Sequence, residues 1–174
     1  QPSLPELPIQ YADYSIWQRG WLEGERMQEQ LAYWTKQLSG APPVLDLPAD
    51  RVRPPLQTVN GTDQRMSLGR ELTGSLKQLS RREDMTPFMV LLEGFDLLLS
   101  RYSGQTDIVV GTPVASRNRI ETENLVGLFL NTLVLRTDLS GAPTVKQLLA
   151  RARETALGAF ANQDVSFERL VEEL

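Results

Sequence analysis

The chain has 174 residues, 41% of them apolar and 23% charged, which is enough for one soluble domain with a hydrophobic core. Its net charge of −4, with 18 basic residues scattered among 22 acidic ones, argues against a nucleic-acid-binding surface. The absence of cysteine excludes disulfides and thiolate metal sites and fits a cytoplasmic location, and the absence of histidine removes the commonest general base.

The first ten residues, QPSLPELPIQ, are expected to form a linker. They are rich in proline, begin without methionine and lack the basic residue and apolar run of a signal peptide. We therefore expect the chain to be a piece of a longer protein.

A single helix is predicted next, over residues 11–38, because apolar side chains from Trp17 to Leu38 recur every three or four residues. Gly40 and the prolines after it end this helix. Residues 40–61 are dense in proline and show no periodicity, which indicates an extended connector. Residues 62–68, TDQRMSL, alternate polar and apolar side chains and are predicted to form a strand.

Two helices are predicted in the middle of the chain. Leucines at helical spacing mark a short amphipathic helix over residues 72–79. Thr86-Pro87 begins the second helix, because threonine can cap free N–H groups and proline is preorganised for the first turn. This helix is apolar almost all round, so we expect it to be buried on several sides. Glu93 and Asp96 interrupt its apolar stretch, which is too short to span a bilayer, and no membrane association is expected.

Two strands and two helices complete the prediction. Residues 106–116, TDIVVGTPVAS, indicate a buried strand that Gly111 and Pro113 halt before a loop. Residues 131–140, NTLVLRTDLS, indicate a second strand of similar character. A long helix should cover residues 145–160, and another should follow with Ser166 as its cap. The order of elements indicates an α/β layered fold.

Few residues can carry chemistry. No pair of carboxylates stands out, no glycine-rich phosphate loop occurs, and no acidic cluster has a ligand spacing, so we expect no metal site. The segment around Thr112 is either a functional loop or a plain strand-end turn. Asn131 begins an apolar strand, where an unpartnered buried amide costs about 1–3 kcal/mol, so it either binds neighbouring backbone or contacts a ligand. Asn162, Gln163 and Asp164 could simply cap helix ends.

Three segments together resemble motifs of the condensation domains of nonribosomal peptide synthetases. YADYSIWQ resembles that family's Tyr-x-Asp-Phe-Ala-Val-Trp-Gln, VGLFLNTLVLR resembles its Gly-x-Phe-Val-Asn-Thr segment, and NQDVSFE resembles its His/Asn-Gln-Asp-x-Pro-Phe-Glu. Arg117 also fits the family, although Ser116 before it stands where glycine is common and Ser166 where proline is usual. The residues that match are Tyr11, Asp13, Trp17 and Gln18, then Gly127, Phe129, Asn131, Thr132 and Arg136, and finally Asn162, Gln163, Asp164, Phe167 and Glu168.

The resemblance implies a chloramphenicol acetyltransferase-like fold, in which two α/β lobes form a V with the active site at the seam. Residues 11–61 would be a helix and connector from the end of the N-terminal lobe, and residues 62–174 an incomplete C-terminal lobe. The family's catalytic His-His-x-x-x-Asp-Gly motif, which normally lies upstream, is absent from this chain. The resemblance therefore implies no catalytic residue in these 174 residues and no activity of the isolated chain.

The resemblance also implies a reaction and partners. Members of the family join an acyl or peptidyl thioester to an aminoacyl acceptor, with both substrates carried on 4'-phosphopantetheine arms. The expected partners are the donor and acceptor carrier domains, an adjacent adenylation domain and the N-terminal lobe, and no cofactor is expected to bind directly. By motif match, the channel would be lined by Thr112, Ser116, Asn131 and Thr132. Gln163 and Asp164 would hold the loop beside it, and the subtype would join two L-configured residues.

Two alternatives remain open. The chain could belong to a non-catalytic module that binds or gates carrier proteins, or to an epimerisation or cyclisation variant of the same fold. In each case half of a two-lobed domain would expose apolar surface, so we expect self-association.

Overall fold

The computed structural model describes residues 6–51, 56 and 61–174. The chain divides into two compact units. The first unit comprises Gln1–Ala41, Val110–Arg136 and Leu157–Leu174, and the second comprises Pro42–Val109 and Thr137–Ala156. The expected division of the domain between residues 61 and 62 stays a prediction, and residues 1–5, 52–55 and 57–60 of the expected linker and connector lie outside the described residues.

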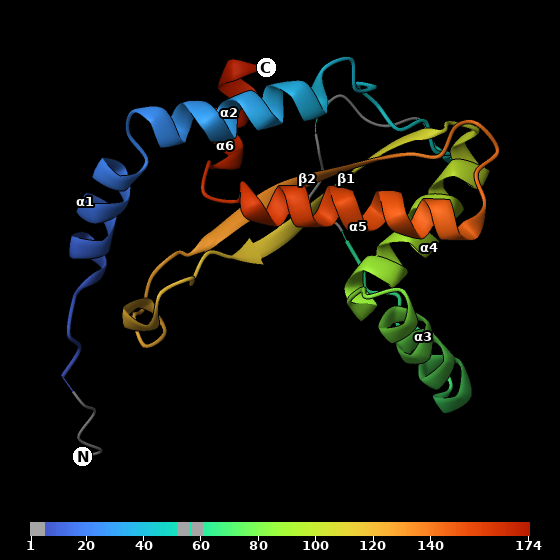
Figure 1. Cartoon of the computed structure of the whole chain (residues 1–174), viewed down its shortest axis with the longest axis horizontal. Coiled ribbons are helices and arrows are strands. Elements are labelled where there is room, and N and C mark those ends of the chain that lie inside the picture. The colour runs from blue at the N-terminus through green and yellow to red at the C-terminus, as the bar shows by residue number, and fades with distance from the viewer. Residues whose placement is uncertain (1–5, 52–55, 57–60) are drawn as a thin grey trace. The chain divides into compact units, whose positions relative to one another are not determined.

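The first unit begins with two helices, α1 (Tyr11–Trp21) and α2 (Glu25–Leu38) (Figure 1). The prediction of one continuous helix is wrong, because the chain breaks between Leu22 and Gly24. Gly24 has a φ of 69°, a conformation that glycine adopts readily and other residues rarely do. The apolar spacing continues across this break, so periodicity alone does not reveal it.

Two strands, β1 (Asp107–Ala115) and β2 (Leu130–Asp138), pair side by side (Figure 1). They are antiparallel, since Ser116 N–H after β1 donates to the Phe129 carbonyl before β2 at 2.6 Å. The prediction of β2 is confirmed, whereas the prediction that Gly111 and Pro113 halt β1 is wrong, because β1 continues to Ala115. A short 3-10 helix, η1 (Ile120–Thr122), lies in the connection between the strands.

Helices α5 (Val145–Ala161) and α6 (Phe167–Glu173) follow β2, as predicted. The Ser166 hydroxyl caps α6 by accepting from Arg169 N–H at 3.3 Å, which confirms the predicted cap. Within the first unit α6 packs on α2. Its core is made of fully or almost fully buried apolar side chains: Trp34, Leu125, Phe129, Leu133, Leu135, Ala159, Val165 and Leu170.

The second unit is built on α3 (Arg70–Arg82) and α4 (Pro87–Ser103), which pack against each other. Thr86 caps α4 by accepting from Met89 N–H at 3.3 Å, as predicted. The prediction of a strand over residues 62–68 is wrong, because residues 61–69 are exposed and have no regular structure. A strand requires a partner for its backbone ladder, and these residues pair with none among those described.

Helix α4 is less buried than predicted. One stripe along it, spaced by alternating three and four residues, is exposed, and we call this stripe the α4 apolar face. It consists of Phe88, Leu91, Phe95, Leu98 and Tyr102. The opposite side, with Met89, Val90, Leu92 and Leu99, is buried. Among the described residues, no helix has both the length and the apolar content needed to cross a membrane.

Two carboxyl groups of α4 are buried in the second unit. Glu93 is 2% exposed and Asp96 is 1% exposed, and their oxygens have no hydrogen-bond partner of ordinary geometry among the described residues. Burial, with the neighbouring Asp96 adding to it, raises the pKa of Glu93 to about 7, while Arg151 acts in the opposite direction. Burial also raises the pKa of Asp96 to about 6, and the nearby Thr137 hydroxyl opposes this rise.

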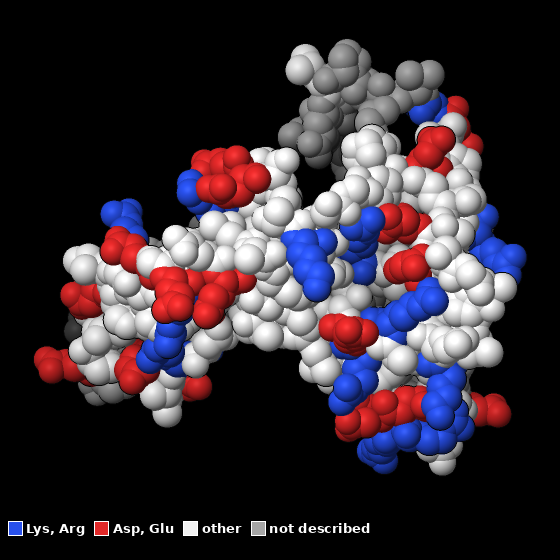
Figure 2. All heavy atoms as spheres, turned by 45° about the horizontal axis from the view of Figure 1, so that its top comes forward, with Lys and Arg blue, Asp and Glu red and all other residues white. Residues whose placement is uncertain are grey.

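Acidic and basic side chains are interspersed on the face drawn in Figure 2, in small mixed groups. That face therefore carries no continuous basic surface of the kind that binds a phosphate backbone.

Candidate functional site

In the first unit, the start of α1 is joined to the segment before β2. The Tyr11 hydroxyl donates to the Leu128 carbonyl at 2.8 Å, and the Tyr11 ring meets Phe129 edge-on at 5.3 Å. Gly127 lies so close to the same ring that a Cβ at this position would overlap it. The matching residues of the first two motifs therefore pack directly on one another.

The loop between α5 and α6 carries the third motif and is held by α2. Trp34, which is fully buried, donates from its indole Nε1 to the Asn162 carbonyl at 2.8 Å. The Gln30 amide donates to the Asp164 carboxylate at 2.9 Å, and its oxygen accepts from Asp164 N–H at 3.1 Å. Gln163 stays within the loop, since its amide donates to the Phe160 carbonyl at 2.9 Å.

Asn131 fastens β2 to this loop. Its amide nitrogen donates to the carbonyls of Gln163 and Val165, both at 2.9 Å. Its amide oxygen accepts from Thr132 N–H at 2.8 Å and from Phe167 N–H at 3.1 Å. Because an amide has two N–H donors and two acceptor sites, the hydrogen-bonding capacity of Asn131 is filled by backbone. Of the two possibilities left open for this residue, the structure shows the first, binding to neighbouring backbone.

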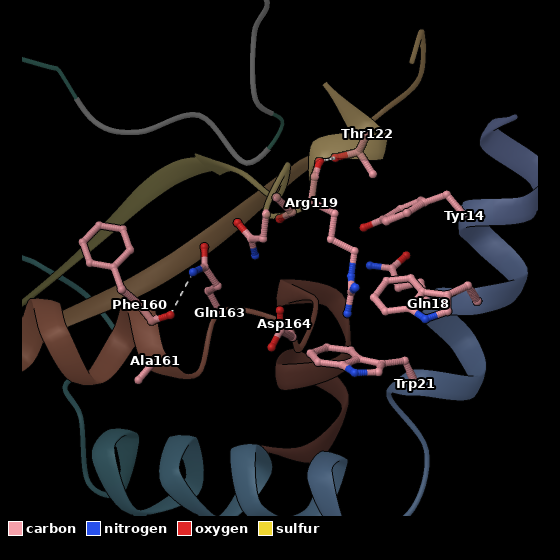
Figure 3. Close-up of a pocket in the computed structure, with 12 residues that line it drawn as sticks. Tyr14, Gln18, Trp21, Arg119, Thr122, Phe160, Ala161, Gln163 and Asp164 are labelled. Atoms are coloured by element: carbon pink, nitrogen blue, oxygen red, sulfur yellow. Dashed lines mark hydrogen bonds between the residues drawn. The ribbon is translucent and has the colours of Figure 1, made fainter. Parts of the chain in front are cut away.

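A cavity of about 510 Å³ lies in the first unit among these segments (Figure 3). Its walls come from α1, from the loop after β1 and from the end of α5 with the loop that follows. They are formed by Tyr14, Trp17, Gln18, Trp21, Ser116, Asn118, Arg119, Thr122, Phe160, Ala161, Gln163 and Asp164. A smaller pocket of about 160 Å³ shares Tyr14, Gln18, Ser116 and Asp164 with it and adds Asn131 and Glu168.

Arginines from the loop after β1 stack on aromatic rings around this cavity. The Arg117 guanidinium carbon lies 4.0 Å from the Phe129 ring centre, and the side chain also donates to the Thr122 carbonyl. The Arg119 guanidinium carbon lies 4.1 Å from the Trp17 ring centre and 6.0 Å from that of Trp21. Arg117 thus has a structural role, while Arg119 projects into the cavity (Figure 3).

The four expected channel residues do not all line the same pocket. Ser116 lines both pockets and Asn131 lines the smaller one. Thr112 in β1 and Thr132 in β2 line neither of these two pockets. A channel role for any of the four stays a prediction.

The remaining motif residues mostly stabilise the fold. Asp13 accepts from Gln10 N–H at 2.8 Å at the start of α1. Arg136 donates to the carbonyls of Gln37 at 3.0 Å and Ser39 at 2.8 Å, at the end of α2 where a cation suits the helix dipole. Within the described ranges, no group of three His, Cys, Asp or Glu side chains gathers as metal ligands would.

Sequence reasoning missed Tyr14, Trp21 and Arg119. Tyr14 and Trp21 lie in or beside an aromatic segment whose side chains are readily explained by packing. Arg119 follows Arg117 by two residues and lies outside the three motifs. The available signal was its position in a loop directly after a strand, where functional side chains are common.

Comparison with known proteins gives one family. The sequence model of the condensation domain matches residues 1–174. The chain is 60% identical over 173 residues to one of the linear gramicidin synthase proteins of Brevibacillus parabrevis, a match that covers 99% of this chain and 3% of that protein. The chain therefore spans a small part of this relative's length.

Two solved structures extend the comparison to the fold. The X-domain from teicoplanin biosynthesis is 30% identical with a TM-score of 0.89, over 98% of this chain and 39% of that one. The first condensation domain of the calcium-dependent antibiotic synthetase, in complex with a substrate analogue, has a TM-score of 0.82 at 22% identity, over 98% of this chain and 39% of that one. These likenesses confirm the expected condensation-domain fold, of which this chain covers a part.

Proposed function

The chain belongs to the condensation-domain family, and on that premise we propose that it forms part of an enzyme unit that makes an amide bond. The donor would be an acyl or peptidyl thioester and the acceptor an aminoacyl group, each delivered on the phosphopantetheine arm of a carrier domain. The observation that carries the proposal is the convergence of the three motif segments around one pocket of about 160 Å³, beside the larger cavity that the first and third segments line.

The chemistry suits a unit whose main task is positioning. A thioester is already activated, so holding it beside the attacking amine can supply about 7 kcal/mol or more of the barrier reduction. A rigid wall is needed for such positioning. The hydrogen bonds of Asn131 and Gln30 to the loop between α5 and α6 supply that rigidity here.

We assign roles on this basis. Asn131 positions the loop that carries Gln163 and Asp164, and Ser116 is the expected channel residue that faces both pockets. Thr112 and Thr132 line neither pocket, so we propose that they contact substrate outside these two pockets. No residue of the chain can serve as a histidine base, because the chain has no histidine, and we expect the isolated chain to form no amide bond.

The absence of histidine from all 174 residues leaves a second candidate open, a module that binds carrier domains without turnover. Carrier domains, with an adenylation domain in the same synthetase, are the proposed partners in both cases. The two candidates differ only in whether a complete domain containing this chain releases product.

A chimera tests the proposal. The 174 residues would replace the matching segment of the linear gramicidin synthase protein to which they are 60% identical. The chimera would be incubated with donor-loaded and acceptor-loaded carrier domains, and the amide product measured by mass spectrometry. We expect product from the chimera and from the unmodified synthase, and none from the isolated chain. A folded chimera that binds both carriers but forms no amide would favour the non-catalytic candidate.

A further inference from the structure

Arg119 presents a positive charge to the cavity of the first unit and is not part of an ion pair with any carboxylate of the described residues. Its guanidinium carbon lies over the Trp17 ring, 4.1 Å from the ring centre, and none of its N–H groups donates to a described residue. The N–H donors lie along the edge of a guanidinium and are left for another partner.

Tyr14 supplies a second donor in the same place. Its ring is only 8% exposed and packs against Phe129 at 4.9 Å and Trp17 at 5.8 Å. Its hydroxyl points into the cavity on the side of Arg119 (Figure 3) and makes no hydrogen bond with the residues that the structure describes. The hydroxyl is not among the buried polar atoms of the described residues, so it is open to the cavity and can donate to a ligand acceptor.

We propose that this cavity binds an oxyanion, a phosphate or carboxylate group of a small ligand, with Arg119 and Tyr14 as its hydrogen-bond donors. A guanidinium edge matches the two oxygens of such a group, and an O–H donor beside it adds a third contact. Burial raises the pKa of the Tyr14 hydroxyl, with Asp164 adding to this rise and Arg119 opposing it, so the hydroxyl stays protonated as a donor. The inference concerns the cavity of this chain alone and does not depend on the proposed amide-forming reaction.

Asp164 lies across the cavity and sets a limit on the affinity. Its carboxylate accepts from Gln30 at 2.9 Å, yet it still places negative charge in the wall facing Arg119 (Figure 3). That charge repels a bound oxyanion. Replacing Asp164 by asparagine keeps an oxygen for Gln30 and removes the charge, so it should tighten oxyanion binding.

The three tryptophans of the chain allow a direct test by nuclear magnetic resonance. Sodium phosphate, and separately sodium acetate, would be titrated into the ¹⁵N-labelled chain at constant ionic strength, and the indole N–H signals followed. We expect saturable shifts of the Trp17 and Trp21 signals, which face the cavity, and none of the buried Trp34 signal. Saturation with phosphate alone, acetate alone or both supports the site and identifies the group that it accepts.

Matched variants make the test specific. Arg119→Gln should weaken binding about tenfold or more, since hydrogen bonds from charged groups are the strong ones. Tyr14→Phe should weaken it severalfold, and Asp164→Asn should strengthen it. Arg26→Gln is the control, because Arg26 also stacks on Trp21, at 4.6 Å, but does not line the cavity. Absence of saturable shifts with both anions would overturn the proposal. So would an Arg119→Gln variant that shows the same shifts as the original chain while its Trp34 signal reports an intact fold.

Discussion

The side-chain amide of Asn131 donates to the main-chain carbonyl of Gln163 at 2.9 Å and so ties the start of β2 to the loop between α5 and α6. These two residues belong to different motifs of the chain. Their relationship is structural: the loop that faces the cavity keeps its shape because an amide 32 residues earlier in the sequence holds its backbone.

Asn131→Ala should therefore destabilise the fold. It leaves two carbonyls and two N–H groups without their partner, at a cost of about 1–3 kcal/mol in the free energy of unfolding. Urea denaturation followed by circular dichroism measures this cost. Asn124→Ala is the matched control, since Asn124 is exposed in the loop between the strands, and it should change the free energy of unfolding little. Equal stability of both variants would refute the structural role of Asn131.

Gly127→Ala should disturb the contact between α1 and the segment before β2. The added Cβ would overlap the Tyr11 ring, and such overpacking typically costs about 1–3 kcal/mol. Gly20→Ala in α1 meets no atom within 4 Å and should instead stabilise the chain by about 0.5–1 kcal/mol, because alanine suits a helix interior better. Thermal unfolding distinguishes the two, and a stabilised Gly127→Ala variant would contradict the observed packing.

The buried carboxyl groups of α4 should make stability depend on pH. Burial raises the pKa of Asp96 from 3.8 to about 6 and of Glu93 from 4.5 to about 7, so the folded chain binds more protons than the unfolded chain. The free energy of unfolding should therefore fall as pH rises from about 4 through 7, on the order of 1–3 kcal/mol for each group, and then level off.

Urea denaturation at intervals between about pH 4 and pH 8 measures this dependence. Glu93→Gln should flatten this fall. The free energy of unfolding of the variant, relative to that of the original chain, should therefore increase from the low end of the pH range to the high end. Glu154→Gln, at an exposed position of α5, should leave the slope unchanged. Identical slopes for Glu93→Gln and the original chain would show that Glu93 titrates normally.

The α4 apolar face should cause self-association of the isolated chain. Its five exposed apolar side chains have the alternating spacing of three and four residues that suits packing against another helix. The double variant Phe95→Gln with Leu98→Gln should shift sedimentation toward the monomer. Ile16→Gln on α1, where Ile16 is 73% exposed and is not part of the α4 apolar face, should have no such effect. A monomeric original chain across a wide concentration range would contradict the prediction.

Local signals predicted most of the fold. Thr86 before Pro87 and Ser166 before α6 act as caps because their hydroxyls bond to backbone within a few residues, which a sequence pattern can reveal. The strand predicted over residues 62–68 failed because strand formation depends on a partner that the alternation of side chains does not specify. The break at Gly24 was not predicted, because the apolar periodicity continues through it.

The candidate site was predicted only in part, for a related reason. The motif residues mark the segments that meet, and Ser116 and Gln163 do face the cavity. The proposed role of Arg119 and Tyr14 depends on their lying together beside Trp17. The contact of Arg119 with Trp17 joins α1 to a loop about 100 residues later in the sequence. No local pattern encodes that juxtaposition.

The hydrogen bond from Trp34 to Asn162 has a consequence for how the chain folds during its synthesis. These residues are 128 positions apart, so Trp34 gains this partner only after 128 further residues have been made. At ribosomal rates that interval is about 6–25 s, far longer than a helix takes to form. Throughout it the Trp34 indole, which is fully buried in the folded structure, lacks its partner Asn162. We expect premature termination before Asn162 to leave an aggregation-prone product, and biosynthesis of this unit to depend on chaperones that cover its first two helices.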